Sequence, residues 1–158
     1  YLKKKSEADA EKAYQKAIET DATYAEAYAS LGNLYNTQKK YEDAAKMTAK
    51  AASLAPAGVG GGDPVAEYSA GAISVNLMVA AEREGKADVA KAKMDEAMAH
   101  FQKAIQLNPE MADAHYELGM LYVKQNKIPE AKKALAEYVR ISPTGANAEM
   151  AKAIATMP

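Results

Sequence analysis

The segment 115–122 reads HYELGMLY, and the segment 28–35 reads YASLGNLY. Aligned residue for residue, both carry a central Leu-Gly pair and end on a tyrosine three residues after the glycine. Residues at these spacings share one face of a helix, and a glycine on that face lets a second helix approach closely. The pattern therefore predicts a helix that packs tightly against a partner helix.

A second pattern follows each of these segments and also occurs elsewhere. Its positions are i, i+4, i+7 and i+12, as in Ala131, Leu135, Tyr138 and Pro143. The first three positions share a helix face, and the proline marks a point where the helix must have ended. The pattern recurs as Ala97, Phe101, Ala104, Pro109; as Ala44, Thr48, Ala51, Pro56; and as Ala10, Tyr14, Ala17, Ala22.

These two patterns together define a repeating unit. The step from Pro109 to Pro143 equals the step from Ala22 to Pro56, and each is about 34 residues long. In the regular copies the step from Gly32 to Ala44 likewise equals the step from Gly119 to Ala131. A fixed period of this kind is typical of stacked supersecondary units. The sequence therefore predicts an all-α array of helical hairpins.

The motifs resemble those of tetratricopeptide repeats, in which an aromatic-x2-Leu-Gly-x2-Tyr helix precedes an Ala-x3-aromatic-x2-Ala-x4-Pro helix. The resemblance implies a right-handed superhelical solenoid of antiparallel helix hairpins. The expected units are a partial first repeat over 1–24, mainly its second helix, a repeat over 25–58, a Gly-rich loop over 59–63, an elongated repeat over 64–111, a repeat over 112–145, and a C-terminal capping helix over 146–158. Because Tyr1 aligns with Tyr35 and Tyr122, we expect the chain to be a fragment of a longer array.

One repeat departs from the period. The step from Gly71 to Ala97 is fourteen positions longer than the corresponding step in the regular copies, and the segment EGK at 84–86 supplies a turn in the middle. Both helices of this repeat are therefore predicted to be seven residues longer than their counterparts. At about 1.5 Å per residue, the hairpin tip should project roughly 10 Å beyond its neighbours.

The stretch APAGVGGGDP at 55–64 precedes this hairpin. It lacks the Lys-Ser or Lys-Thr of a phosphate-binding P-loop, and it does not complete the Gly-x-Gly-x-x-Gly pattern of dinucleotide sites. Asp63-Pro64 instead favours a helix start, with Asp63 as N-cap and Pro64 in the first turn. We interpret the glycines as a permissive linker.

Composition excludes several classes of function. The chain has 158 residues, 26% of them charged, a net charge of −1 and no cysteine. This balance argues against a nucleic-acid-binding or membrane-inserted protein, and the lack of cysteine excludes disulfides and thiolate metal sites. The two histidines, His100 and His115, are not placed as metal ligands or as an acid–base pair. We therefore expect no enzyme activity, no cofactor and no metal, in a soluble protein whose compartment, cytoplasmic or extracytoplasmic, the sequence leaves open.

The resemblance implies a protein–protein interaction scaffold that binds a peptide or a partner helix in a concave groove lined by the first helices. Ala29, Asp113 and Glu117 stand where the family's carboxylate clamp has basic residues, so we expect no such clamp. The residues expected to face the groove are Asn33, Asn36, Thr37, Tyr116, Met120, Val123 and Lys124.

Two other functions remain open. The elongated hairpin over 64–108, with its Gly-rich loop, could be the contact surface of a subunit in a multiprotein complex, or could mediate self-association. Alternatively, the chain could be a regulatory or accessory domain of a larger enzyme.

Overall fold

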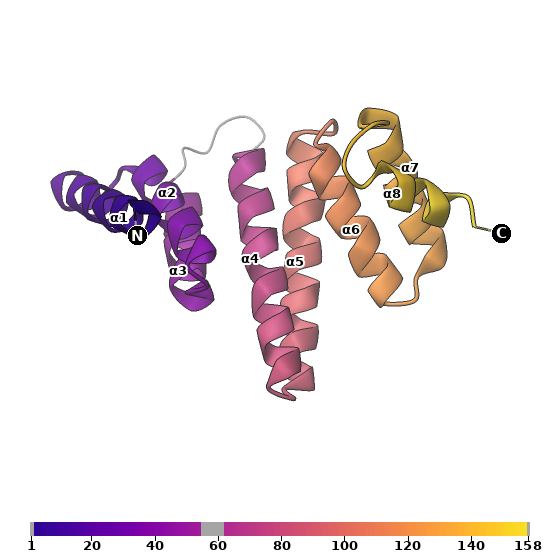
Figure 1. Ribbon diagram of the computed structural model, residues 1–158, viewed down its shortest axis with the longest axis horizontal. Coiled ribbons are helices and arrows are strands. Elements are labelled where there is room, and N and C mark those ends of the chain that lie inside the picture. Colours follow the sequence, from indigo (N-terminus) through magenta and orange to yellow (C-terminus); the bar gives the residue numbers. More distant parts are fainter. Residues whose placement is uncertain (1, 55–61, 158) are drawn as a thin grey trace.

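The computed structural model describes residues 2–54 and 62–157, and within these residues all regular secondary structure is α-helix, with no strand. The helices follow one another in a row from the N-terminus at one end to the C-terminus at the other (Figure 1). The predicted all-α solenoid of helix hairpins is confirmed. The helices are α1 Leu2–Thr20, α2 Ala25–Thr37, α3 Tyr41–Leu54, α4 Pro64–Arg83, α5 Ala87–Leu107, α6 Ala112–Lys124, α7 Ile128–Ile141 and α8 Ala148–Ala155.

Three antiparallel hairpins form the body of the array: α2 with α3, α4 with α5, and α6 with α7. The turn inside each hairpin has one residue with positive φ, which is Lys39 at 62°, Gly85 at 72° and Asn126 at 58°. In each turn the amide of the next residue donates 2.9 Å to a carbonyl five residues earlier, as from Lys86 N to Ala81 O. The three turns therefore share the same backbone conformation and hydrogen bond.

The middle hairpin is longer than the other two. Helix α4 has 20 residues and α5 has 21, whereas α2 and α6 have 13 each and α3 and α7 have 14 each. Each helix of the middle hairpin therefore exceeds its counterparts by seven residues, which is the difference that the repeat spacing predicts. Its tip extends beyond the neighbouring hairpins (Figure 1).

A glycine in the first helix of each hairpin sits against a side chain of the second helix. A Cβ added to Gly32 would lie 2.7 Å from Thr48 Oγ1, one added to Gly71 would lie 2.6 Å from Phe101 Cε1, and one added to Gly119 would lie 2.7 Å from Leu135 Cγ. All three distances are shorter than a non-bonded contact, so the helices approach closely at these points only because the residue is glycine. This assigns Gly71 as the counterpart of Gly32 and Gly119.

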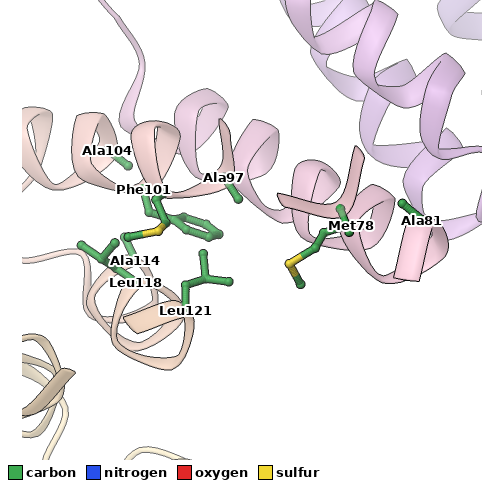
Figure 2. Close-up of a cluster of buried hydrophobic side chains, with 10 residues drawn as sticks. Met78, Ala81, Ala97, Phe101, Ala104, Ala114, Leu118 and Leu121 are labelled. Atoms are coloured by element: carbon green, nitrogen blue, oxygen red, sulfur yellow. The ribbon is translucent and has the colours of Figure 1, made fainter. Parts of the chain in front are cut away.

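The largest buried cluster joins α4 and α5 to α6. Phe101 is fully buried, and Figure 2 shows its ring beside Ala114, Leu118 and Leu121 of α6. A second cluster closes the C-terminal end, where Ala148 and Ala151 of α8 pack against Leu135 and Tyr138 of α7. Helix α8 therefore buries an apolar face of the last hairpin that would otherwise face solvent.

Helix α4 begins at the Asp63-Pro64 pair, as the sequence predicts. Asp63 Oδ1 accepts a hydrogen bond of 2.9 Å from the amide of Val65, and Pro64 is the first helical residue. Most of the Gly-rich loop over 59–63 lies outside the described residues, which resume at Gly62. In the part of the chain that is described, no helix combines the length and the hydrophobicity needed to cross a membrane.

Helix α1 occupies the span in which we expect mainly the second helix of a partial first repeat. Although Tyr1 aligns with Tyr35, which is followed by a turn, α1 runs without a break from Leu2 to Thr20. The run that follows Tyr1 is LKKKSEADAEKA, which has no glycine or proline and is rich in Lys, Glu and Ala. The turn between α2 and α3 also has no glycine or proline, so local composition alone does not explain why α1 is continuous.

Candidate functional site

The first helices of the three hairpins, α2, α4 and α6, lie beside one another and are bridged by polar side chains. Asn76 Nδ2 on α4 donates 2.9 Å to Asn36 Oδ1 on α2. Lys124 Nζ on α6 lies 2.9 Å from Glu82 Oε1 on α4. These contacts link the three helices along one side of the array, which is the side where the family resemblance predicts the concave groove, and we call it the concave face.

The residues expected on this face differ in how far they are available to a partner. Asn33, Thr37 and Lys124 are exposed, whereas Asn36, Tyr116, Met120 and Val123 are partly buried. Two of the seven already have side-chain partners on α4, because Asn36 accepts from Asn76 and Lys124 pairs with Glu82. Asn33 and Met120 are adjacent to the glycines Gly32 and Gly119 and so occupy matching positions in two repeats.

Tyr116 contacts the C-terminal end of the array. Its ring centroid lies 5.2 Å from that of Tyr138 on α7, and its hydroxyl donates to Met150 Sδ on α8 at 3.4 Å. Val123 also packs against the C-terminal cluster of Leu135, Tyr138, Ala148 and Ala151. The structure therefore places these two side chains in the packing that holds α8, at the end of the concave face.

Asn76 is a residue that the sequence analysis missed. It lies five residues after Gly71, as Thr37 does after Gly32 and Lys124 after Gly119. The same offset that selected Thr37 and Lys124 therefore selects Asn76 once the elongated repeat is aligned on Gly71. Tyr68, three residues before Gly71, corresponds in the same way to Tyr116.

An acidic surface lies between α4 and α6. Burial raises the pKa of Glu117 above its ordinary value, and the nearby charge of Asp113 raises it further. Burial likewise raises the pKa of Tyr68, with smaller contributions from the charges of Glu117 and Asp113. These two carboxylates therefore give this part of the concave face a negative charge that disfavours an anionic group.

The histidines have structural contacts. His115 Nε2 lies 2.9 Å from the carbonyl oxygen of Pro109, to which its N–H donates across the loop before α6. His100 Nδ1 lies 2.8 Å from Glu67 Oε2, which joins α5 to α4. Over residues 2–54 and 62–157, no group of three His, Asp or Glu side chains is arranged to hold a metal ion.

Comparison with protein families gives two matches, both described as tetratricopeptide repeat, over residues 13–46 and 88–155. The first match covers the end of α1, all of α2 and the start of α3, and the second covers nearly all of α5 together with α6, α7 and α8. The chain belongs to the tetratricopeptide repeat family. Members of this family are in general non-catalytic modules that bind proteins or peptides. No curated protein matches the chain in sequence.

Solved tetratricopeptide repeat structures share the fold. A crystal structure of MamA superposes with a TM-score of 0.74 at 25% sequence identity, covering 97% of this chain and 80% of that one. The first repeat domain of Spaghetti (RPAP3), bound to the HSP90 peptide SRMEEVD, gives a TM-score of 0.63 at 21% identity, covering 85% and 92%. The protein TTC0263 of Thermus thermophilus gives a TM-score of 0.68 at 15% identity, covering 90% and 67%.

Proposed function

We propose that the protein is a non-catalytic scaffold that binds an extended peptide or a partner helix on the concave face of α2, α4 and α6. The observation that carries this proposal is the continuity of that face, which the Asn36–Asn76 and Lys124–Glu82 contacts bridge across all three hairpins. Stacked helical hairpins of this kind present an extended surface to their ligands.

The chemistry of the face supports a ligand held through its backbone and apolar side chains. Asn33 presents an exposed amide, which can donate to and accept from a peptide backbone. Met120 supplies an adaptable apolar contact at the matching position of the last hairpin. Asp113 and Glu117 oppose a ligand carboxylate, so the free C-terminus of a peptide is not the expected anchor.

The test uses a partner captured by the protein, then purified and titrated calorimetrically against variants. Met120→Glu should weaken that partner's binding by at least about tenfold, because it places a charge in the apolar contact. Ala136→Glu, at an exposed position of α7, is the matched control and should bind as the unmodified chain does. Equal binding by Met120→Glu and the control would contradict the proposal.

The elongated hairpin supports a second candidate, a structural contact within a larger assembly. Its tip exposes 48% of Val89, and a hollow of about 340 Å³ beside it is lined by Glu82, Gly85, Ala87, Ala90, Lys91 and Met94. Deleting 77–83 together with 87–93 removes seven residues from each helix and leaves the turn at Gly85 in place. Since seven residues make nearly two turns, the remaining faces keep their alignment.

The two variants separate the two candidates. Because the shortened hairpin also lacks Glu82, Lys124→Ala is its control, since it removes the same contact with the hairpin at full length. Loss of the partner in the shortened hairpin but not in Lys124→Ala or Met120→Glu supports the structural contact, and loss only in Met120→Glu supports the concave face. If both variants keep the partner, both proposals are wrong. Circular dichroism and thermal unfolding of the shortened chain establish that it folds before its binding is compared.

A further inference from the structure

A cavity of about 710 Å³ lies between the hairpin α2–α3 and the hairpin α4–α5. This volume is within the range of about 300–1,000 Å³ that is usual for ligand sites. Its walls come from all four helices, and alanine is the commonest residue in them. The lining residues are Ala25, Glu26, Ala29, Ala45, Thr48, Ala49, Ala51, Ala52, Gly62, Asp63, Ala66, Glu67, Ala70, Ile73, Ser74, Glu96 and His100.

The repeat itself explains why this junction is hollow. The next junction, between α4–α5 and α6, is built from the same positions, and there Leu118, Phe101 and Met98 form part of one buried cluster against which Ile105 packs. Leu118 and Ala70 each precede the repeat glycine, while Met98 and Ala45 each follow the repeat's first alanine. At four matching positions the hollow junction has a smaller side chain: Ala70 for Leu118, Thr48 for Phe101, Ala45 for Met98 and Ala52 for Ile105.

The charges along the cavity are mainly negative. Four carboxylates line it, and among the described lining residues there is no lysine or arginine. Glu67 pairs with His100 at 2.8 Å, and Glu96 pairs at 2.6 Å with Lys93, which is not part of the wall. Glu26 accepts a hydrogen bond of 3.1 Å from the hydroxyl of Tyr24, and Asp63 caps α4. A cationic group at this rim therefore meets carboxylates on both hairpins.

We propose that this cavity is a second binding site, which takes a peptide segment of another protein carrying bulky apolar side chains next to arginine or lysine. The apolar side chains supply the volume that Leu118, Phe101, Met98 and Ile105 supply in the next junction. The basic side chains pair with the carboxylates of the rim, and arginine does so through two parallel hydrogen bonds. The site goes beyond the concave face because α3 and α5 form part of its wall.

The test uses three synthetic peptides and calorimetric titration. Acetyl-Arg-Phe-Leu-Arg-amide should bind at least about tenfold more tightly than acetyl-Glu-Phe-Leu-Glu-amide, which reverses the charge, and acetyl-Arg-Ala-Ala-Arg-amide, which removes the bulk. Its binding should weaken when salt rises from about 0.05 to 0.5 M, because screening shortens the range of the charge attraction.

Ala70→Leu is the decisive variant, since it places at Ala70 the side chain that Leu118 has in the filled junction. It should raise the unfolding temperature by roughly 2–4 °C and weaken the binding of acetyl-Arg-Phe-Leu-Arg-amide by at least about tenfold. Ala136→Leu, on the exposed face of α7, is the control and should bind as the unmodified chain does. Ala45→Met fills the same cavity from α3 and should give the same loss, which covers the case in which Ala70→Leu does not fold.

Several outcomes would overturn the proposal. Unchanged binding in both filled variants would place the peptide elsewhere, and equal binding of the arginine and glutamate peptides would remove the role of the carboxylates. A lack of binding by all three peptides would also overturn it. If sedimentation shows a dimer that Ala70→Leu dissociates, a second copy of the chain fills the cavity and a foreign peptide does not.

Discussion

The hairpins α2–α3 and α4–α5 have the same backbone plan but supply very different side-chain volume. Both have a glycine seated on the partner helix and a turn with one residue at positive φ. At this glycine contact, however, Gly32 packs against the small side chain of Thr48, whereas Gly71 packs against the ring of Phe101. The comparison shows that the positions of the helices in this fold depend on repeat spacing and turn geometry. The side-chain volume packed between the helices varies independently of both.

The largest effect on stability should come from the two residues that the repeat glycines contact, Phe101 and Thr48. Phe101→Ala removes a fully buried ring and should lower the free energy of unfolding by about 3–5 kcal/mol. Thr48→Ala should cost only about 1 kcal/mol, because it removes one hydrogen bond, from Thr48 Oγ1 to Ala44 O at 2.9 Å. Urea unfolding measures both. Similar losses in the two variants would mean that the two hairpins are equally well packed.

The next largest effect should come from exchanging the residues that precede the repeat glycines. Leu118→Ala opens the filled junction and should cost about 2–5 kcal/mol. Ala70→Leu buries additional methyl and methylene groups in the hollow junction and should gain roughly 1 kcal/mol. Opposite signs in thermal unfolding support the difference between the junctions, and a loss in both variants would contradict it.

A smaller effect should come from the three turns. Lys39→Gly and Asn126→Gly relieve a positive φ and should each stabilise by about 0.5–1 kcal/mol, with the smaller gain at Asn126, because asparagine tolerates this conformation better. Gly85→Ala should cost about 1 kcal/mol at the same place in the elongated hairpin. Chemical denaturation of the three single variants checks that the turns are equivalent.

The smallest effect should come from Glu117, which stands where α4 has Ser69 and α2 has Ser30. Since burial raises the pKa of Glu117, its charged carboxylate destabilises the folded state. This loss of stability is absent below the unfolded pKa of about 4.3 and grows as the pH rises through the folded pKa. Glu117→Gln should therefore unfold at a higher temperature than the unmodified chain at pH 7. The difference should vanish at about pH 4, and a difference of equal size at both pH values would rule out this origin.

Much of the fold could be predicted because the repeat positions carry it. The offsets from Gly71 to the turn and from the turn to Ala97 were enough to predict the lengths of α4 and α5, since each helix has a regular rise per residue. The contact between Gly71 and Phe101 follows from the same alignment.

The candidate site was harder to predict. The pairing of Asn36 with Asn76 depends on how two hairpins stack, and the cavity depends on the combined volume of side chains from four helices. Neither property belongs to a single motif. The partial burial of Tyr116 likewise depends on where α8 lies, because Met150 and Tyr138 meet it from two other helices.

The equal lengthening of α4 and α5 has a consequence for how such an array can change its dimensions. Seven residues return each helix to within about 20° of its starting orientation, whereas an insertion of five would turn the apolar stripe away by about 140°. A hairpin in this fold can therefore lengthen in discrete steps, provided that both of its helices take the same step. An array of this kind can therefore extend one hairpin further from its neighbours without altering the order in which the hairpins stack.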